Sequence, residues 1–174
     1  MDRATRAAEE WARERPDLDL LPMALLGTLA EAAQVIARDH LRPFFAAHGL
    51  QAGEFDVLAT LRRTGHPYAL TPTALYEATM VTSGAMTGRI DRLEQAGWVT
   101  RQPDPSDRRG TLVALTKQGH ELIDGLMAAH VANEQRVVTG LSRADQETLL
   151  RLLTKLLAAL PAASSRSFDG PTGR

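Results

Sequence analysis

The most informative pattern of apolar and polar positions lies in residues 71–116. Thr71-Pro72 is typical of a helix start, because threonine caps the first turn and the missing proline N–H needs no partner there. Apolar residues follow at helical spacing, and a short turn at Met80-Val81 leads to Thr82, which we expect to cap a second helix. Gly97 is placed to end that helix. Two short helices joined by a tight turn indicate a helix-turn-helix.

The second helix has two different faces. Met86, Ile90 and Leu93 fall on one side, whereas the other side begins with small and hydroxyl-bearing residues. Small side chains allow close approach to a DNA groove, and the N–H groups at a helix start bind phosphates. An ordinary amphipathic helix is the alternative. With the basic residues that follow, the expected DNA contacts are Thr82, Ser83, Gly84, Thr87, Gly88, Asp91, Arg92, Arg108 and Arg109.

The residues after this helix have the pattern of a β-hairpin. A β-like run at 98–102 precedes a turn-rich stretch at 103–110 and a second run at 111–115. We expect Arg108 and Arg109 at the tip of this two-stranded wing. An arginine held out on a β-ribbon suits the negative potential of a narrow minor groove. A solvated turn is the alternative.

This segment resembles the winged helix-turn-helix of the MarR family of bacterial transcription regulators. The likeness covers roughly residues 18–160 and is carried by Asp107-x-Arg109 followed after five residues by Leu115-Thr116, by Leu70-Thr71-Pro72-Thr73, and by Arg89-Ile90-Asp91-Arg92-Leu93-Glu94. The resemblance implies that the wing aspartate and arginine pair with each other. It also implies that a wing arginine enters the minor groove.

Outside the winged helix the pattern is almost entirely helical. We expect a long helix over residues 22–47, kinked near residue 39 because Pro43 lies within it. Further helices are expected over 51–63 and 117–138, and a last one is expected to begin at Ser142 with a capping box. Leucines cover a wide arc of that last helix, more than one small domain can bury. The surplus favours a second copy of the chain, and the resemblance implies that first and last helices interdigitate about a two-fold axis.

The predicted fold is therefore mainly α with a small β-wing, a winged helix-turn-helix joined to a helical dimerisation layer. The expected segments are an extra N-terminal helix at 1–17, a dimerisation helix at 18–50, the DNA-binding region at 51–116, C-terminal dimerisation helices at 117–160 and a disordered tail at 161–174.

Four residues are unexpected at their positions. Three are charged side chains in or near apolar segments, and the fourth is a tryptophan on a charged helix. Trp11 lies on the short charged N-terminal helix, Asp56 lies in an apolar run, Arg89 faces inward and Arg101 lies on the first wing strand. Charges near a core are costly unless they are paired or bind a ligand. These positions resemble the ligand site of the urate-responsive, HucR- or PecS-like branch of the MarR family. The resemblance implies that they bind a planar anion such as urate; a structural ion pair beside a packed tryptophan is the alternative.

The composition of the chain limits the kinds of ligand and the cellular location that we expect. The 174-residue chain has a net charge of −1, but residues 82–117 hold six basic and four acidic residues, which favours selective rather than bulk phosphate binding. The absence of cysteine excludes disulfides and thiolate metal sites, and the five histidines are scattered. We expect no metal and no cofactor. No apolar run is long enough to span a membrane, so a soluble, cytoplasmic protein is expected.

These features together predict a homodimeric, ligand-responsive transcriptional regulator. We expect a repressor that binds a pseudo-palindromic double-stranded DNA operator and is released from it by a small anion such as urate. One alternative is a constitutive architectural DNA-binding protein that has no ligand. Another is an enzyme that uses the winged helix only to dimerise; the sequence has no nucleotide loop or nucleophile motif, and no catalytic residue is expected.

Overall fold

The computed structural model of the chain describes residues 2–79 and 86–160, except for the side chain of Arg108. The expected turn at Met80-Val81 and the residues Thr82, Ser83 and Gly84 lie outside this part, as does the tail at 161–174. The elements are α1 (Arg3–Glu14), α2 (Leu21–Val35), the π-helix η1 (Ile36–Leu41), α3 (Arg42–Ala47), α4 (Ala52–Arg63), β1 (Ala69–Leu70), α5 (Pro72–Ala78), α6 (Met86–Gln95), β2 (Val99–Asp104), β3 (Asp107–Leu115), α7 (Lys117–Val137) and α8 (Arg143–Ala159).

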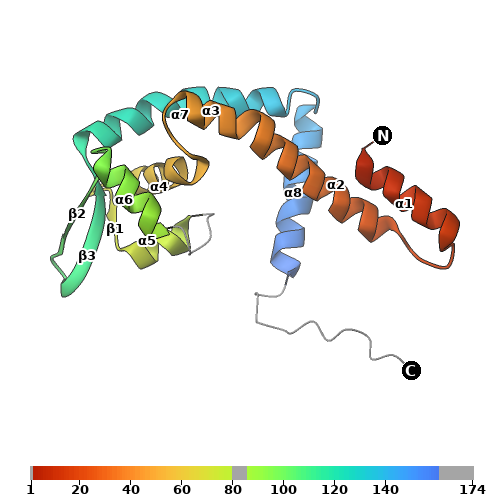
Figure 1. Ribbon diagram of the computed structural model, residues 1–174, viewed down its shortest axis with the longest axis horizontal. Coiled ribbons are helices and arrows are strands. Elements are labelled where there is room, and N and C mark those ends of the chain that lie inside the picture. The colour runs from red at the N-terminus through yellow and green to blue at the C-terminus, as the bar shows by residue number, and fades with distance from the viewer. Residues whose placement is uncertain (1, 80–85, 161–174) are drawn as a thin grey trace. The chain divides into compact units, whose positions relative to one another are not determined.

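The chain is mainly helical with one small antiparallel sheet, which confirms the predicted class (Figure 1). Residues up to Val137 form one compact unit, and α8 belongs to a second unit. No helix of the described residues is long and apolar enough to cross a membrane.

The core lies within the winged-helix region. The buried apolar side of α6 packs with α4, and α5, β2, β3 and α7 close the cluster. This confirms the predicted inward face of α6. Among the described residues, the largest side chains that are less than 2 % exposed are Leu58, Leu61, Leu75, Ile90, Leu93, Ile123, Val57, Val99, Val113 and Thr60.

Several of the residues that the sequence predicted to begin or end helices do so in the structure. The Thr71 hydroxyl accepts the N–H of Ala74 at 3.1 Å and caps α5. Gly97 follows α6 with φ of +76°, a left-handed conformation that glycine adopts without strain. Ser142 and Asp145 form the expected capping box at the start of α8.

The sheet has three strands, in the order β1-β3-β2, where the sequence predicted two. The additional strand β1 pairs Ala69 with Ala114 and Leu70 with Val113. A two-residue strand has no detectable alternation of its own, so only its pairing with β3 reveals it.

The wing is longer and its turn tighter than predicted. Strands β2 and β3 extend to Asp104 and Asp107, so only Pro105-Ser106 lie between them. Residues 108 and 109 therefore lie within β3, and the prediction that they form the hairpin tip is wrong. The carboxylates of Asp104 and Asp107 accept the N–H groups of Ser106 at 2.8 Å and Arg109 at 2.9 Å, which closes the turn early.

The expected side-chain ion pair between Asp107 and Arg109 is not among the ion pairs of the described residues. Asp107 instead stiffens the wing through the backbone hydrogen bond to Arg109.

The long first helix is continuous from Leu21 to Ala47 but changes type in the middle. The expected irregularity near residue 39 takes the form of the π-helix η1, after which the N–H of Arg42 donates to the carbonyl of Ala37. From α7, the buried side chain of Asn133 donates to the carbonyl of His40 at 3.1 Å. This hydrogen bond fixes α7 to the π-helical stretch.

The predicted N-terminal helix is present as α1 and packs along α2 (Figure 1). The contact is close because Gly27 carries no side chain: a Cβ there would lie 2.6 Å from the Cβ of Ala4. Arg3 bonds Glu31 at 2.7 Å and Asp2 accepts the hydroxyl of Thr28 at 3.1 Å. These bonds hold the start of α1 on α2.

Candidate functional site

Helix α6 lies between α4 and the wing, and charged side chains join it to both (Figure 1). On the α4 side, Arg92 donates from Nε to the buried carboxylate of Glu54 at 2.6 Å. The other oxygen of Glu54 accepts the N–H of Gln51 at 2.8 Å. A buried carboxylate requires such partners, so this pair ties α6 to the first turn of α4.

Arg89 lies one helical turn before Arg92 and rests against the same turn of α4. A Cβ at Gly53 would lie 2.3 Å from Nε of Arg89, so only glycine leaves room for this guanidinium. One of its terminal nitrogens, Nη1, is buried and has no hydrogen-bond partner among the described residues. A buried cationic donor without an acceptor is costly, which marks this position as one where an anion would be stabilised.

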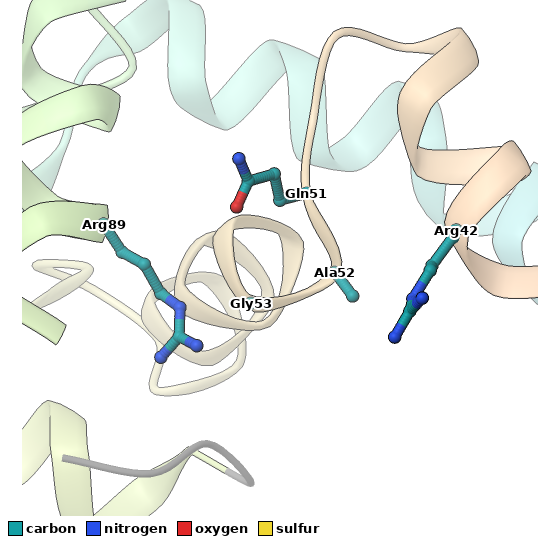
Figure 2. Close-up of a pocket in the computed structure, with 5 residues that line it drawn as sticks. All are labelled: Arg42, Gln51, Ala52, Gly53 and Arg89. Carbon is teal, nitrogen blue, oxygen red and sulfur yellow. The ribbon is translucent and has the colours of Figure 1, made fainter. Parts of the chain in front are cut away.

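A pocket of about 330 Å³ opens beside Arg89, lined by Arg42, Gln51, Ala52, Gly53 and Arg89. Figure 2 shows the two arginines approaching the first turn of α4 from opposite sides, Arg89 from α6 and Arg42 from α3. Two guanidinium groups and a helix N-terminus all favour negative charge. The sequence did not predict Arg42 as a site residue, because no local pattern links it to Arg89.

Asp56 lies one turn after Gly53 on α4 and is partly buried. Positions three apart lie on the same side of a helix, so Asp56 lies on the side of α4 that meets Arg89. It does not line the pocket itself.

Arg101 joins α6 to the wing rather than to the pocket. Its guanidinium bonds Asp91 at 2.5 Å and also bonds Glu94, and its backbone N–H donates to Glu94 at 3.0 Å. The hydrogen bond to Asp91 raises the pKa of the Arg101 guanidinium above its ordinary value. Arg101 therefore stays charged and is engaged by both carboxylates.

Trp11 lies on α1 and is 49 % exposed. It borders a separate hollow with Ala7, Glu10 and Glu14. The described chain therefore does not gather the four expected ligand residues in one pocket: Arg89 lines the pocket at α4, Trp11 lines another, and Arg101 pairs with α6.

The expected DNA contacts also divide into groups. Thr87 and Gly88 are exposed on the first described turn of α6, and Arg109 is exposed on β3. Asp91 and Arg92 are held in the ion pairs with Arg101 and Glu54. Within residues 2–79 and 86–160, no cluster of three or more His, Asp or Glu side chains could hold a metal ion.

Comparison with known proteins shows which family this chain belongs to. Residues 48–110 match the MarR family. The HTH-type transcriptional regulator PecS of Dickeya dadantii is 42% identical over 148 residues, which are 85% of this chain and 89% of PecS. Such relatives are transcriptional regulators, so the enzyme alternative is excluded.

Solved structures agree with the sequence match. Sco3205, a MarR family transcriptional regulator from Streptomyces coelicolor solved in complex with DNA, superposes with a TM-score of 0.74 at 25% identity, over 84% of this chain and 91% of that one. Bordetella bronchiseptica BpsR, whose DNA binding is regulated by 6-hydroxynicotinic acid, has a TM-score of 0.69 at 28% identity, over 77% and 93%. The chain therefore belongs to the MarR family of transcriptional regulators.

Proposed function

We propose that this regulator binds an operator in double-stranded DNA as a homodimer and is released from it by a small planar anion, as a repressor would be. The observation that carries the DNA-binding part is the geometry of α6. Its apolar face is buried against α4, whereas Thr87 and Gly88 are exposed at its start and the wing follows directly. Sco3205, which is similar in structure, was solved in complex with DNA. Residues 82–84 and the wing arginines 108 and 109 complete the proposed DNA surface.

Two helices supply the argument for a dimer. Neither α2 nor α8 has a buried residue within the single chain, although both are rich in leucine. A second copy would cover these faces and create two-fold symmetry. A two-fold dimer matches a pseudo-palindromic site with half-sites ~10 bp apart. The large apolar side chains exposed on the two helices are Leu21, Met23, Leu25, Leu26, Leu149, Leu150, Leu152 and Leu157.

The pocket between Arg42 and Arg89 supports the ligand part. A planar carboxylate or urate-like anion could bond both guanidinium forks, including the unpartnered Nη1 of Arg89. The regulation of BpsR by 6-hydroxynicotinic acid supports a planar anion as the class. Urate is the specific ligand that the resemblance implies, and Trp11, Asp56 and Arg101 as further ligand contacts stay predictions.

The same geometry couples the ligand to DNA. Arg89 is part of α6, whereas Arg42 and Gly53 belong to other helices. An anion that draws Arg89 toward Arg42 would shift α6 relative to α4. Helix α6 would then no longer match the operator, and the affinity for DNA would fall. Ligand and DNA must then oppose each other reciprocally, by roughly 1–3 kcal/mol.

The test begins with selection of bound duplexes from a random library, followed by anisotropy titrations with and without urate or 6-hydroxynicotinate. We expect a pseudo-palindromic site and weaker binding when the anion is present. The variants Arg89→Ala and Trp11→Phe should still bind DNA but respond less to the anion. A protein that selects no duplex would refute the DNA-binding role. One that binds DNA equally tightly with every anion would be the constitutive architectural alternative.

Gly53→Ala provides a matched perturbation of the pocket. It keeps both arginines, but the added Cβ would collide with the Arg89 guanidinium and displace it. The anion response should fall as in Arg89→Ala, whereas α4 gains a better helix former. An unchanged anion response in Gly53→Ala would mean that the position of Arg89 is irrelevant to ligand binding.

A further inference from the structure

The DNA-facing helix α6 carries two carboxylates close to its proposed contact surface. Asp91 and Glu94 are one helical turn apart, and their side chains are 48% and 37% exposed. Both face the wing strand β2, where Arg101 bonds them together. Uncompensated carboxylates here would repel the phosphate backbone of a bound duplex.

The Arg101 side chain is positioned by this contact. Its two terminal nitrogens reach one carboxylate each, and its own N–H donates to Glu94 as well. Three bonds therefore join the first wing strand to α6 at one residue. In a winged helix the helix and the wing must reach neighbouring parts of the duplex together, so their separation matters for binding.

We infer that Arg101 is a positioning residue for DNA binding: it fixes the wing to α6 and neutralises Asp91 and Glu94, without contacting the DNA itself. This inference rests on the proposed DNA-binding function. It also gives Arg101 a different role from the ligand contact that the family resemblance implies, because a ligand at Arg101 would have to displace a carboxylate.

The experiment measures affinity for the selected duplex over a salt series in four proteins: the wild type, Arg101→Gln, the pair Asp91→Asn with Glu94→Gln, and the triple variant. Arg101→Gln leaves two unpaired carboxylates and should weaken binding about tenfold at low salt. The loss should shrink as salt rises, since the repulsion is screened. The triple variant removes the repulsion but does not restore the bonds that hold the wing on α6, so it should recover only part of the affinity.

Two further variants separate charge from geometry and from nonspecific damage. Arg101→Lys keeps the charge but cannot bond both carboxylates in the same fork, so we expect an intermediate affinity. Arg62→Gln is the matched control, because Arg62 forms a similarly exposed ion pair with Asp124 of α7. Its DNA affinity should equal that of the wild type, and thermal unfolding of every variant shows whether the fold is retained.

Three results would overturn the inference. Arg101→Gln could bind as tightly as the wild type. The triple variant could stay as weak as Arg101→Gln with a shallower salt dependence, which would indicate a direct phosphate contact. Arg101→Gln could also keep its DNA affinity and lose only the anion response, which would make Arg101 a ligand residue. A wild-type protein that binds no duplex would instead refute the proposed function on which the inference rests.

Discussion

The winged-helix region and the long flanking helices differ in how much of their surface one chain can cover. Helix α4 buries six of its 12 residues, whereas α2, with 15 residues, and α8, with 17, bury none. All three helices are rich in apolar side chains. The part that we propose reads DNA therefore has a core within the chain, whereas the apolar faces of the other two helices are left uncovered by the described residues.

This difference in burial implies a difference in where the two regions gain their stability. Burying a leucine side chain is worth about 1.5–3 kcal/mol. Helix α4 gains that stabilisation within one chain, so the stability of its region should not depend on protein concentration. In the proposed dimer, helices α2 and α8 would gain it only when a second copy covers them, and stability that arises from association rises with concentration. The predictions that follow test this contrast from the largest expected effect to the smallest.

The largest loss should come from Gly119→Ala. A Cβ at Gly119 would lie 1.9 Å from the backbone carbonyl oxygen of Trp98, which cannot move without disturbing the core. We expect the free energy of unfolding to fall by about 3 kcal/mol. The matched control is Gly125→Ala in the same helix, where nothing lies within 4 Å and alanine should stabilise by about 0.5–1 kcal/mol. Denaturant unfolding measures both; equal midpoints would contradict the close contact.

The second effect concerns α8. Leu157 is 69% exposed in the single chain, and a surface substitution there should cost less than about 0.5 kcal/mol if nothing covers it. If a second copy covers it, Leu157→Ser should weaken the dimer by about 2 kcal/mol. Sedimentation across a concentration series measures this, with the exposed Arg151→Ser as control. Identical association of the two variants would argue against α8 as the dimer surface.

The third effect lies at the boundary between the two kinds of region. Asn133 of α7 is buried and donates to the carbonyl of His40 in the π-helix η1. Asn133→Ala leaves that carbonyl without its donor, and we expect a loss of about 1–2 kcal/mol. Hydrogen exchange should show faster opening of residues 36–41 than in the wild type. Unchanged exchange there would mean that the π-helix is held by other contacts.

The smallest effect is a pH dependence at the start of α1. The N–H and hydroxyl of Thr5 donate to Asp2 and lower the pKa of its carboxyl from 3.8 to about 2. The carboxylate therefore stabilises the capped helix fully above pH 3.8, and this contribution is lost as the pH falls toward about 2. Asp2→Asn keeps an acceptor but does not titrate. The Thr5 amide shift should titrate over this range only in the wild type.

Several elements of the fold follow from the sequence because their causes are local. The caps at Thr71 and Ser142, the glycine at 97 and the inward side of α6 each depend on residues within about one helical turn. The wing turn was predicted too long, because proline, aspartate and serine favour turns of several lengths. The hydrogen bonds of Asp104 and Asp107 decide the length that forms.

The sequence by itself thus determined the order of the elements, the apolar stripes and the identity of the winged helix-turn-helix. Only the tertiary structure decided which charges meet. In the folded chain Arg42 and Arg89 line the same pocket, and Arg101 forms ion pairs with Asp91 and Glu94. The pairing of strand β1 with β3 was likewise visible only in the tertiary structure. These partners come from separate elements, and local spacing carries no information about them. Arg42 and Arg89 line one pocket because α3 and α6 both pack against α4, so the candidate ligand site could be predicted only through Arg89.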